Sequence, residues 1–183
     1  MKKGKILLAT PNLKGFSDGI NRIAPSLGLM LIAQKLIDDG HKVKIHDFAL
    51  EGWNNRKTID AKNKLVSIGQ SDDDIANIIS NFSPDIVLIS VLYSNLLESA
   101  GNIARIAKKV SKNIKVVIGG NCISNAISDY KYGITTKDSN MPDYITCLEE
   151  ENFDFAMIGE AEFTTVQLVN TIMTNGEVSK IPG

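Results

Sequence analysis

The stretch VVIGGNCISN, residues 116–125, holds a strand and its interruption, and the fold can be predicted outward from it. Val116, Val117 and Ile118 form an unbroken β-branched run, which is typical of a strand buried on both faces. Gly119 and Gly120 end the run, and small polar residues follow. Since a turn needs only one glycine, the second glycine predicts that something approaches this backbone closely.

Similar apolar runs recur along the chain and alternate with amphipathic stretches. We expect strands at residues 5–10, 42–47, 85–91, 115–118 and 153–158, the second of them near a sheet edge. Helices are expected from Pro25 to about residue 36, where Gly40 follows as the stop, and at 72–81, 96–110 and 161–174. Residues 51–70 resist assignment, and 126–151 read as irregular with a short helix at 143–150.

This alternation of strand and helix predicts an α/β fold with a parallel sheet covered on both faces. Five units fit one doubly wound, flavodoxin-like (Rossmann-like) domain with strand order 2-1-3-4-5. We expect a single domain over residues 1–183, with its core at about 5–174.

Composition and charge exclude several classes of partner. Hydrophobic residues make up 43% and charged residues 22%, and the net charge of −1 argues against nucleic acid or an anionic membrane surface as partner. No apolar run is long enough to span a bilayer and no signal peptide is evident, so a cytoplasmic location is expected. Cys122 and Cys147 lack metal-site spacing and are expected to be reduced thiols.

Ligands of open parallel sheets bind beyond the carboxyl ends of the strands. The segments expected there are small, polar and almost uncharged, and they lack any phosphate-binding glycine loop. Neither His41 nor His46 fits a catalytic triad, and both are expected to be solvated residues flanking the second strand. A large, uncharged, hydrogen-bonding ligand is therefore predicted to contact Thr10, Pro11, Asn12, Ser90, Val91, Leu92, Tyr93, Ser94, Gly119, Gly120, Asn121, Ser124, Gly159 and Glu160.

Four stretches together resemble the cobalamin-binding (B12-binding) domain found at the N-terminus of many radical SAM proteins. They are APSLGL at 24–29, with GHKV at 40–43; SPDIV at 83–87, with Ile89 and Ser90; VIGG at 117–120; and FDFAMIGEAE at 153–162. Each motif is weak alone, but all four occur in order. The likeness covers about residues 5–174.

The resemblance implies roles for several of these residues. Gly119 and Gly120 would line the slot for the nucleotide tail of the cofactor, where Asn121 and Ser124 offer hydrogen bonds; a tight turn is the other interpretation. Ser90 would meet the benzimidazole nitrogen, or else cap its own strand. Tyr93, with its neighbours, would face the corrin rim or serve packing.

Two departures from the family pattern have consequences. The loop at 11–19 lacks the histidine of the D-x-H-x-x-G motif, so the resemblance implies base-off cobalamin without a protein histidine on cobalt. The CxxxCxxC motif is also absent. A 4Fe–4S cluster and S-adenosylmethionine would then belong to a C-terminal radical SAM domain, the expected partner, and this chain would not catalyse a reaction alone.

The resemblance implies a module that presents a corrinoid to that domain, for methyl transfer or a radical rearrangement. The alternative is a flavodoxin-like docking domain that has lost corrinoid binding. A flavin- or nucleotide-binding domain is a third possibility, against which stands the lack of a phosphate-cradling loop.

Overall fold

The computed structural model describes residues 2–131 and 152–181. Its centre is a five-stranded, wholly parallel sheet in the order β3-β1-β6-β7-β8. Along the chain, the first to fifth strands of this sheet are β1, β3, β6, β7 and β8. The predicted order 2-1-3-4-5 is therefore confirmed. Their bounds are Lys5–Thr10, Lys42–Asp47, Ile86–Ser90, Lys115–Gly119 and Phe155–Ala156, respectively.

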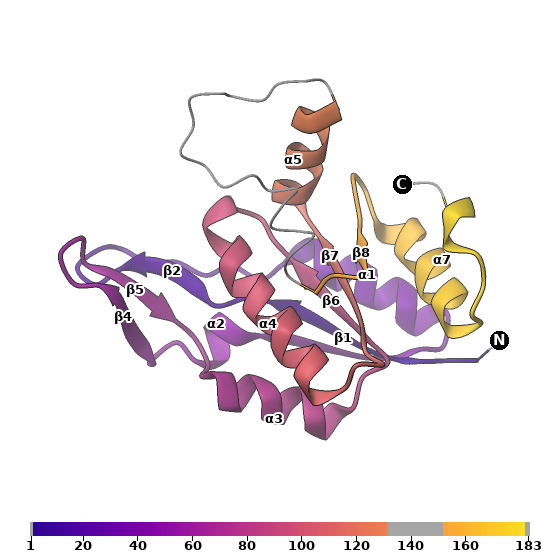
Figure 1. The fold of residues 1–183 in the computed structure, drawn as a ribbon, viewed down its shortest axis with the longest axis horizontal. Helices are drawn as coiled ribbons and strands as arrows, with labels where there is room; N and C mark the ends of the chain where they lie inside the picture. The colour runs from indigo at the N-terminus through magenta and orange to yellow at the C-terminus, as the bar shows by residue number, and fades with distance from the viewer. Residues whose placement is uncertain (1, 132–151, 182–183) are drawn as a thin grey trace.

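Helices cover both faces of this sheet (Figure 1). On one face, α1 (Leu27–Asp38) packs beside α7 (Glu162–Met173) over a core that includes Ile6, Leu8 and Val117. On the other, α3 (Asp72–Phe82) packs beside α4 (Leu97–Val110) over a core that includes Leu7, Ile89 and Ile118. Side chains of each strand alternate between these two apolar layers, as the unbroken apolar runs predict.

The remaining helical elements are short or lie at the sheet's rim. They are α2 (Phe48–Glu51), α5 (Asn121–Lys131) and the 3₁₀ turns η1 (Ser94–Leu96) and η2 (Val178–Lys180). Helix α5 begins directly after β7, so the prediction of irregular chain from residue 126 was wrong for residues 126–131. The helix predicted at 143–150 lies outside the described residues. None of the described helices combines the length and apolar character needed to cross a membrane.

Local caps explain where two helices begin. At α3, the Ser71 hydroxyl accepts from the backbone of Asp74, whose carboxylate accepts from Ser71 in return, which forms a capping box. Helix α1 begins at Leu27 with Ser26 as its N-cap, two residues later than Pro25 suggests.

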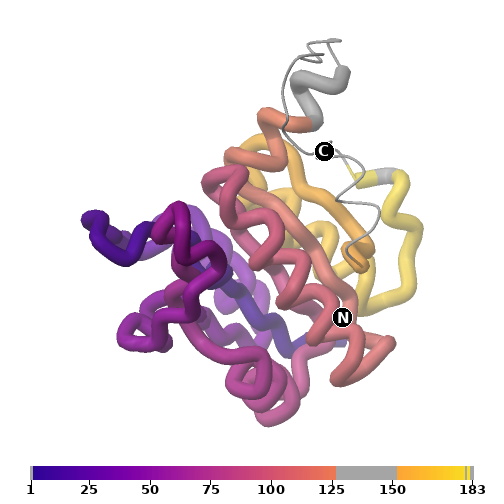
Figure 2. The backbone as a smooth tube through the Cα atoms, turned by 60° about the vertical axis from the view of Figure 1, so that its left-hand side comes forward, coloured from indigo at the N-terminus to yellow at the C-terminus, as the bar shows by residue number. Residues whose placement is uncertain are grey.

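A second, antiparallel sheet in the order β2-β5-β4 was not predicted. Its strands are Leu13–Phe16, Leu65–Ile68 and Arg56–Asp60. It follows the carboxyl end of β1 and projects from one end of the molecule, at the left of Figure 1 and in indigo to purple in Figure 2. Only Val66 and Ile68 of β5 are buried strand residues with large side chains, so the sheet shows little apolar periodicity.

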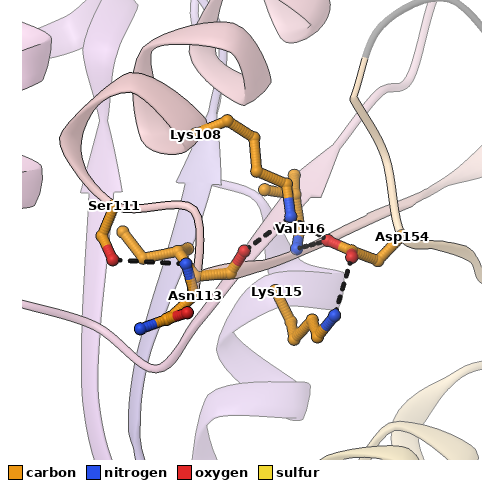
Figure 3. A network of polar contacts seen from close by, with 7 residues as sticks. Lys108, Ser111, Asn113, Lys115, Val116 and Asp154 are labelled. Carbon is orange, nitrogen blue, oxygen red and sulfur yellow. Dashed lines mark hydrogen bonds and ion pairs between the residues drawn. The ribbon is translucent and has the colours of Figure 1, made fainter.

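At the amino edge of the main sheet, two aspartates, each just before one strand, hold the start of the strand next to it. The Asp85 carboxylate accepts the backbone N–H of Lys5, 2.8 Å away, at the start of β1. Asp154 accepts the backbone N–H of Val116 at 2.8 Å, at the start of β7, and also contacts two lysines (Figure 3). Both aspartates belong to the motifs that resemble the B12-binding family, and here both stabilise the scaffold.

The two lysines on Asp154 come from different elements. Lys108 Nζ lies 2.5 Å from Oδ2 and also donates to the carbonyl of Ile114, while Lys115 Nζ lies 3.1 Å from Oδ1 (Figure 3). Burial raises the pKa of Asp154, but the hydrogen bonds from Lys108, Val116 and Lys115 outweigh it, so the pKa is lowered overall. The carboxylate is therefore ionised at neutral pH.

The expectation that both histidines are solvated was wrong, since His41 and His46 are both buried. His41 Nδ1 accepts the backbone N–H of Gly4 at 3.1 Å, and its Nε2 lies 3.1 Å from Asp39 Oδ2 without the alignment of a hydrogen bond. Burial lowers the pKa of His41, so the ring is neutral at pH 7. His46 is the one buried residue of the edge strand β3, and His41 lies directly before that strand.

Candidate functional site

Small side chains stand side by side at the carboxyl ends of three adjacent strands. Ser90 pairs with Gly119, and because Ala9 pairs with Ile89, Thr10 lies next to Ser90. Strand alternation places all three positions on the same face as Leu8, which is the face covered by α1 and α7. We call Thr10, Ser90 and Gly119 the carboxyl row; it carries no charge.

The carboxyl row contains an unsatisfied polar atom. Thr10 Oγ1 is buried and has no hydrogen-bond partner among the described residues. Thr165 Oγ1, on α7, is in the same condition, and its residue is fully buried. Thr165 precedes the sheet-facing Leu168 and Val169 by one turn, so it lies on the same side of α7. Unpaired buried hydroxyls are costly, which indicates that a ligand or water satisfies them.

Two glycines mark open space on this side of the molecule. A Cβ atom added at Gly28, in the first turn of α1, or at Gly159, after β8, would have no atom of the described residues within 4 Å beyond its own chain neighbours and local helix backbone. Gly159 has a φ of +74°, which favours glycine for conformational reasons, whereas Gly28 is helical and needs no glycine for its backbone. Sequence reasoning did not single out Gly28 or Thr165; Gly28 lies within the quoted motif at 24–29, and nothing in the sequence marks Thr165.

The glycine pair after β7 is explained by the chain itself. At Gly120, where φ is +107°, an added Cβ would lie 2.6 Å from the carbonyl oxygen of Val91 and 3.0 Å from its backbone carbon and nitrogen. At Gly119 an added Cβ would lie 3.3 Å from Cβ of Met157. The close approach that the sequence predicted is thus made by the segment after β6 at Gly120. Contact of either glycine with a cofactor stays a prediction.

A hydrogen bond joins helix α5, which follows this glycine pair, to the segment after β8. Ser124 Oγ accepts the backbone N–H of Gly159 at 2.9 Å and lies 3.3 Å from the carbonyl of Gly120, to which it can donate. The Ser124 hydroxyl is therefore used within the protein. Asn121 and Glu160 are exposed at the same margin.

The segment after β6 divides its side chains between the core and the surface. Val91 is fully buried in the layer under α3 and α4, and its N–H donates to the carbonyl of Gly119 at 2.8 Å. Leu92 and Tyr93 are 48% and 68% exposed, and Ser94 is exposed too. The predicted ligand residues of this segment therefore include one core residue, Val91.

Large apolar side chains lie exposed around the carboxyl edge. Besides Leu92 and Tyr93, they include Leu27 at the start of α1 and Phe163 at the start of α7, which are 64% and 71% exposed. Both helices begin at the carboxyl edge because they run antiparallel to the strands that they cover. Lys35 Nζ lies 4.8 Å from the centre of the Phe163 ring. This edge offers apolar surface beside a neutral row.

The segment after β1 is held by hydrogen bonds to Gln70, a residue that lies between β5 and α3. Asn12 Nδ2 donates to the carbonyl of Gln70 and its Oδ1 accepts the N–H of Gln70, so both ends of this amide are used. Gln70 Oε1 in turn lies 2.7 Å from His46 Nε2, and the His46 ring packs edge-on against Phe48. Pro11 is buried. Asn12 thus fixes the second sheet to the end of β1.

Metal-binding and thiol chemistry have no visible basis in the described residues. No group of three His, Cys, Asp or Glu side chains among them could hold a metal ion. Cys122 is buried, and burial raises the pKa of its thiol. Cys147 lies outside the described part of the chain.

Comparisons with known proteins agree with this geometry. Residues 18–136 match the B12 binding domain family. Over 175 residues the chain is 31% identical to a protein of Streptomyces wedmorensis named cytidylyl-2-hydroxyethylphosphonate methyltransferase. That match covers 96% of this chain and 29% of the relative. An uncharacterized methyltransferase of Pyrococcus horikoshii is 28% identical over 100% of this chain and 32% of its own length. The chain thus spans about a third of either relative.

A solved structure supports the fold. A cobalamin-binding protein from Desulfitobacterium hafniense aligns with a TM-score of 0.54 at 16% identity, over 93% of this chain and 60% of that protein. Since the family match covers well over half of the 183 residues, the chain belongs to the family of B12-binding domains.

Proposed function

We propose that this chain binds a corrinoid at the carboxyl edge of its main sheet, with the nucleotide tail of the cofactor against the carboxyl row. The observation that carries the proposal is the buried, unpartnered hydroxyl of Thr10 in a neutral row of small side chains. A ligand tail that accepts or donates a hydrogen bond there would remove the cost of leaving this hydroxyl unpaired.

The residues present suit such a group. Thr10 and Ser90 supply hydroxyls, and the absent side chains of Gly28 and Gly159 leave space beside them. Exposed Leu92 and Tyr93 supply apolar surface of the kind that a macrocycle can cover. Cobalamin, when bound, supplies a cobalt-linked methyl group or a reactive radical; the chain itself binds and orients the group.

A base-off state without a histidine ligand remains our proposal for the cobalt. Both histidines of the sequence have structural positions: His41 accepts from Gly4 at the amino edge, and His46 pairs with Gln70. Neither belongs to the loop at 11–19, where the family's ligand histidine would lie. This supports a lower axial position without protein imidazole.

A larger parent protein supplies the reaction in this proposal. Both curated relatives are about three times as long as this chain and both are named methyltransferases. We infer that a radical SAM domain with a 4Fe–4S cluster and S-adenosylmethionine works beside this domain, and that the corrinoid serves methyl transfer. The sequence resemblance supports that partner, because the quoted motifs are those of B12-binding domains joined to radical SAM proteins.

Cofactor binding can be tested directly on the 183-residue chain. The protein is mixed with hydroxocobalamin, desalted, and its visible absorption is compared with its protein content. Near-stoichiometric retention is expected for the unchanged chain. Ser90→Leu should abolish retention by filling the row, and Thr10→Val, which keeps the shape but removes the hydroxyl, should weaken binding about three- to tenfold.

Thr58→Val is a matched control, because Thr58 is exposed on β4, away from the row. It should bind like the unchanged chain, and circular dichroism should show that all three variants fold. A colourless unchanged protein, or Ser90→Leu protein that stays fully coloured, contradicts the proposal.

The second candidate function, a docking domain without corrinoid, is favoured by one observation. The glycine pair is explained by contacts within the chain, so it does not by itself require a ligand. Such a domain would fold and remain colourless in the same assay. The open space at Gly28 and the unpaired Thr10 hydroxyl favour the corrinoid over this alternative.

A further inference from the structure

A concave site lies on the opposite face from the carboxyl row. It is an open groove of about 1030 Å³ between the second sheet and the outer surfaces of α3 and α4. The carboxyl row faces α1 and α7, so the two sites are separated by the main sheet. The groove exists because the second sheet is added to the plain alternation of strand and helix.

The walls of the groove are fixed by close packing at their base. Asn12 pairs with the backbone of Gln70, as described above, and an added Cβ at Gly69 would lie 2.0 Å from Asn12 Oδ1. An added Cβ at Gly52 would lie 2.1 Å from the backbone of Gly69. These contacts hold the second sheet in place against the end of β1, so the groove is a built feature of the fold.

Positive charge predominates on the lining. Four cationic side chains but only two acidic ones line the groove: Lys14, Arg56, Lys57 and Arg105, and Asp72 and Glu98. Glu98 is paired with Lys14, and Asp72 accepts a hydrogen bond from Asn102. Both acidic groups are therefore already engaged.

Arg56 and Lys57 supply the excess charge. They are consecutive, exposed residues at the start of β4, and no ion pair joins either of them to another residue of the described chain. Side chains alternate along a strand, so it is Lys57, paired with the groove-lining Ser67, that shares the sheet face of Lys14. Cationic groups without acidic partners favour anions, and phosphoryl groups above all, because their N–H donors match phosphate oxygens.

The rest of the lining indicates a polar organic ligand. Amide side chains supply further donors and acceptors, notably those of Asn54, Asn55 and Gln70. Ile59, which is 46% exposed, provides one apolar wall. The volume is that of a site for a nucleotide-sized molecule.

We propose that this groove binds a small organic anion bearing phosphoryl groups, at a site separate from the corrinoid. An acidic peptide segment of a partner protein is the competing occupant. The amide-rich lining favours the small molecule, since these amides offer hydrogen-bond donors and acceptors that an acidic peptide, attracted by charge, would leave largely unused.

The test uses isothermal titration calorimetry on the unchanged 183-residue chain at low ionic strength. Adenosine diphosphate and pyrophosphate are the phosphoryl probes, adenosine is the uncharged probe, and a hexaglutamate peptide represents the acidic segment. Both phosphoryl probes should bind, with adenosine diphosphate tighter, and affinity should fall as salt rises. Adenosine should bind at least about tenfold more weakly than adenosine diphosphate.

A charge-removing double variant, Arg56→Gln with Lys57→Gln, should weaken both phosphoryl probes at least about tenfold. The matched control is Lys5→Gln with Lys42→Gln, which removes two exposed positive charges at the amino edge of the main sheet, outside the groove lining. Its affinities should stay within about twofold. Hydroxocobalamin retention should be unchanged in both, which separates this proposal from the corrinoid site.

Three results overturn the proposal. The first is no binding of either phosphoryl probe at millimolar concentration. The second is an equal loss in the control variant, which would mean attraction to net charge alone. The third is tighter binding of hexaglutamate than of adenosine diphosphate, which would assign the groove to an acidic peptide.

Discussion

Replacing Gly120 by alanine tests the claim that this glycine is required by the protein's own backbone. The new methyl carbon would lie 2.6 Å from the Val91 carbonyl oxygen, well inside contact distance, and φ is +107°, where side-chain-bearing residues are strained. Backbone strain of this kind costs about 1–3 kcal/mol, and forced repacking costs about 1–3 kcal/mol more. We expect the free energy of unfolding to fall by about 2–6 kcal/mol, a large share of a typical domain's stability.

The matched control is Gly28→Ala, because both positions change from glycine to alanine. Gly28 lies in a helix and its added methyl group meets no atom of the described residues within 4 Å beyond its chain neighbours and local helix backbone. Alanine is the better helix former, so the variant should gain up to about 1 kcal/mol. The two substitutions are therefore expected to change stability in opposite directions.

Urea unfolding of the cofactor-free chain, followed by circular dichroism at 222 nm, measures both effects. The transition slopes should match, so that shifts in the midpoint report stability. A loss below about 1 kcal/mol in Gly120→Ala, or an equal loss in Gly28→Ala, would refute the geometric argument. In the desalting assay Gly28→Ala should also release hydroxocobalamin more easily, since its methyl group enters the open space beside the row.

Two further predictions concern the amino edge of the sheet. Asp154→Asn should lower the free energy of unfolding by about 1–3 kcal/mol, because it removes the negative charge that Lys108, Lys115 and the Val116 N–H all contact. As the control, Asp73→Asn, at an exposed position on α3, should change the free energy of unfolding by less than about 0.5 kcal/mol in the same urea titration. The second prediction is a pH effect at His41, whose pKa burial lowers below that of the unfolded chain, about 6.5. Because the unfolded state then binds the proton more readily, this contribution to stability is complete above that value and is lost as the pH falls below it, by up to about 1.4 kcal/mol per pH unit. Urea midpoints between pH 8 and pH 5.5 should show this decline, and His41→Asn should flatten it; an unchanged slope in that variant would contradict the assignment.

The main sheet was predictable because its strands are unbroken apolar runs. The runs at 5–10, 85–91 and 115–118 fill both cores, and such runs leave few alternatives to a covered parallel sheet. The last strand was predicted at 153–158 but spans only Phe155–Ala156, since an edge strand needs few ladder bonds. The length of an edge strand depends more on its pairing with the neighbouring strand than on its own apolar pattern.

The second sheet was missed for a physical reason. Strand β4 is almost wholly exposed, and β2 contains Gly15, so neither shows the alternation that identifies a strand. Their pairing is determined by contacts distant in sequence, such as Asn12 with Gln70. The groove that depends on this sheet was therefore invisible in the sequence.

The candidate site was predicted in outline and missed in detail. Ser90 does lie between Thr10 and Gly119 at the carboxyl ends of adjacent strands, as the sheet order requires. Thr165 could not be predicted as a site residue from the sequence, because its position depends on how α7 packs across the sheet. The need for Gly120 was recognised, but the approaching atom, the Val91 carbonyl, becomes evident only from the coordinates.

The hydrogen bonds of Asp85, Asp154 and His41 hold the amino edge of the main sheet independently of the segments at its carboxyl edge. Exposed parts of those segments can then change in length or composition without loosening the amino edge. Grafting experiments should begin there: exchanging the chain between β6 and α4 for that of a relative ought to alter cofactor preference while the melting temperature is largely preserved. The architecture thus separates what must stay constant from what selection can vary.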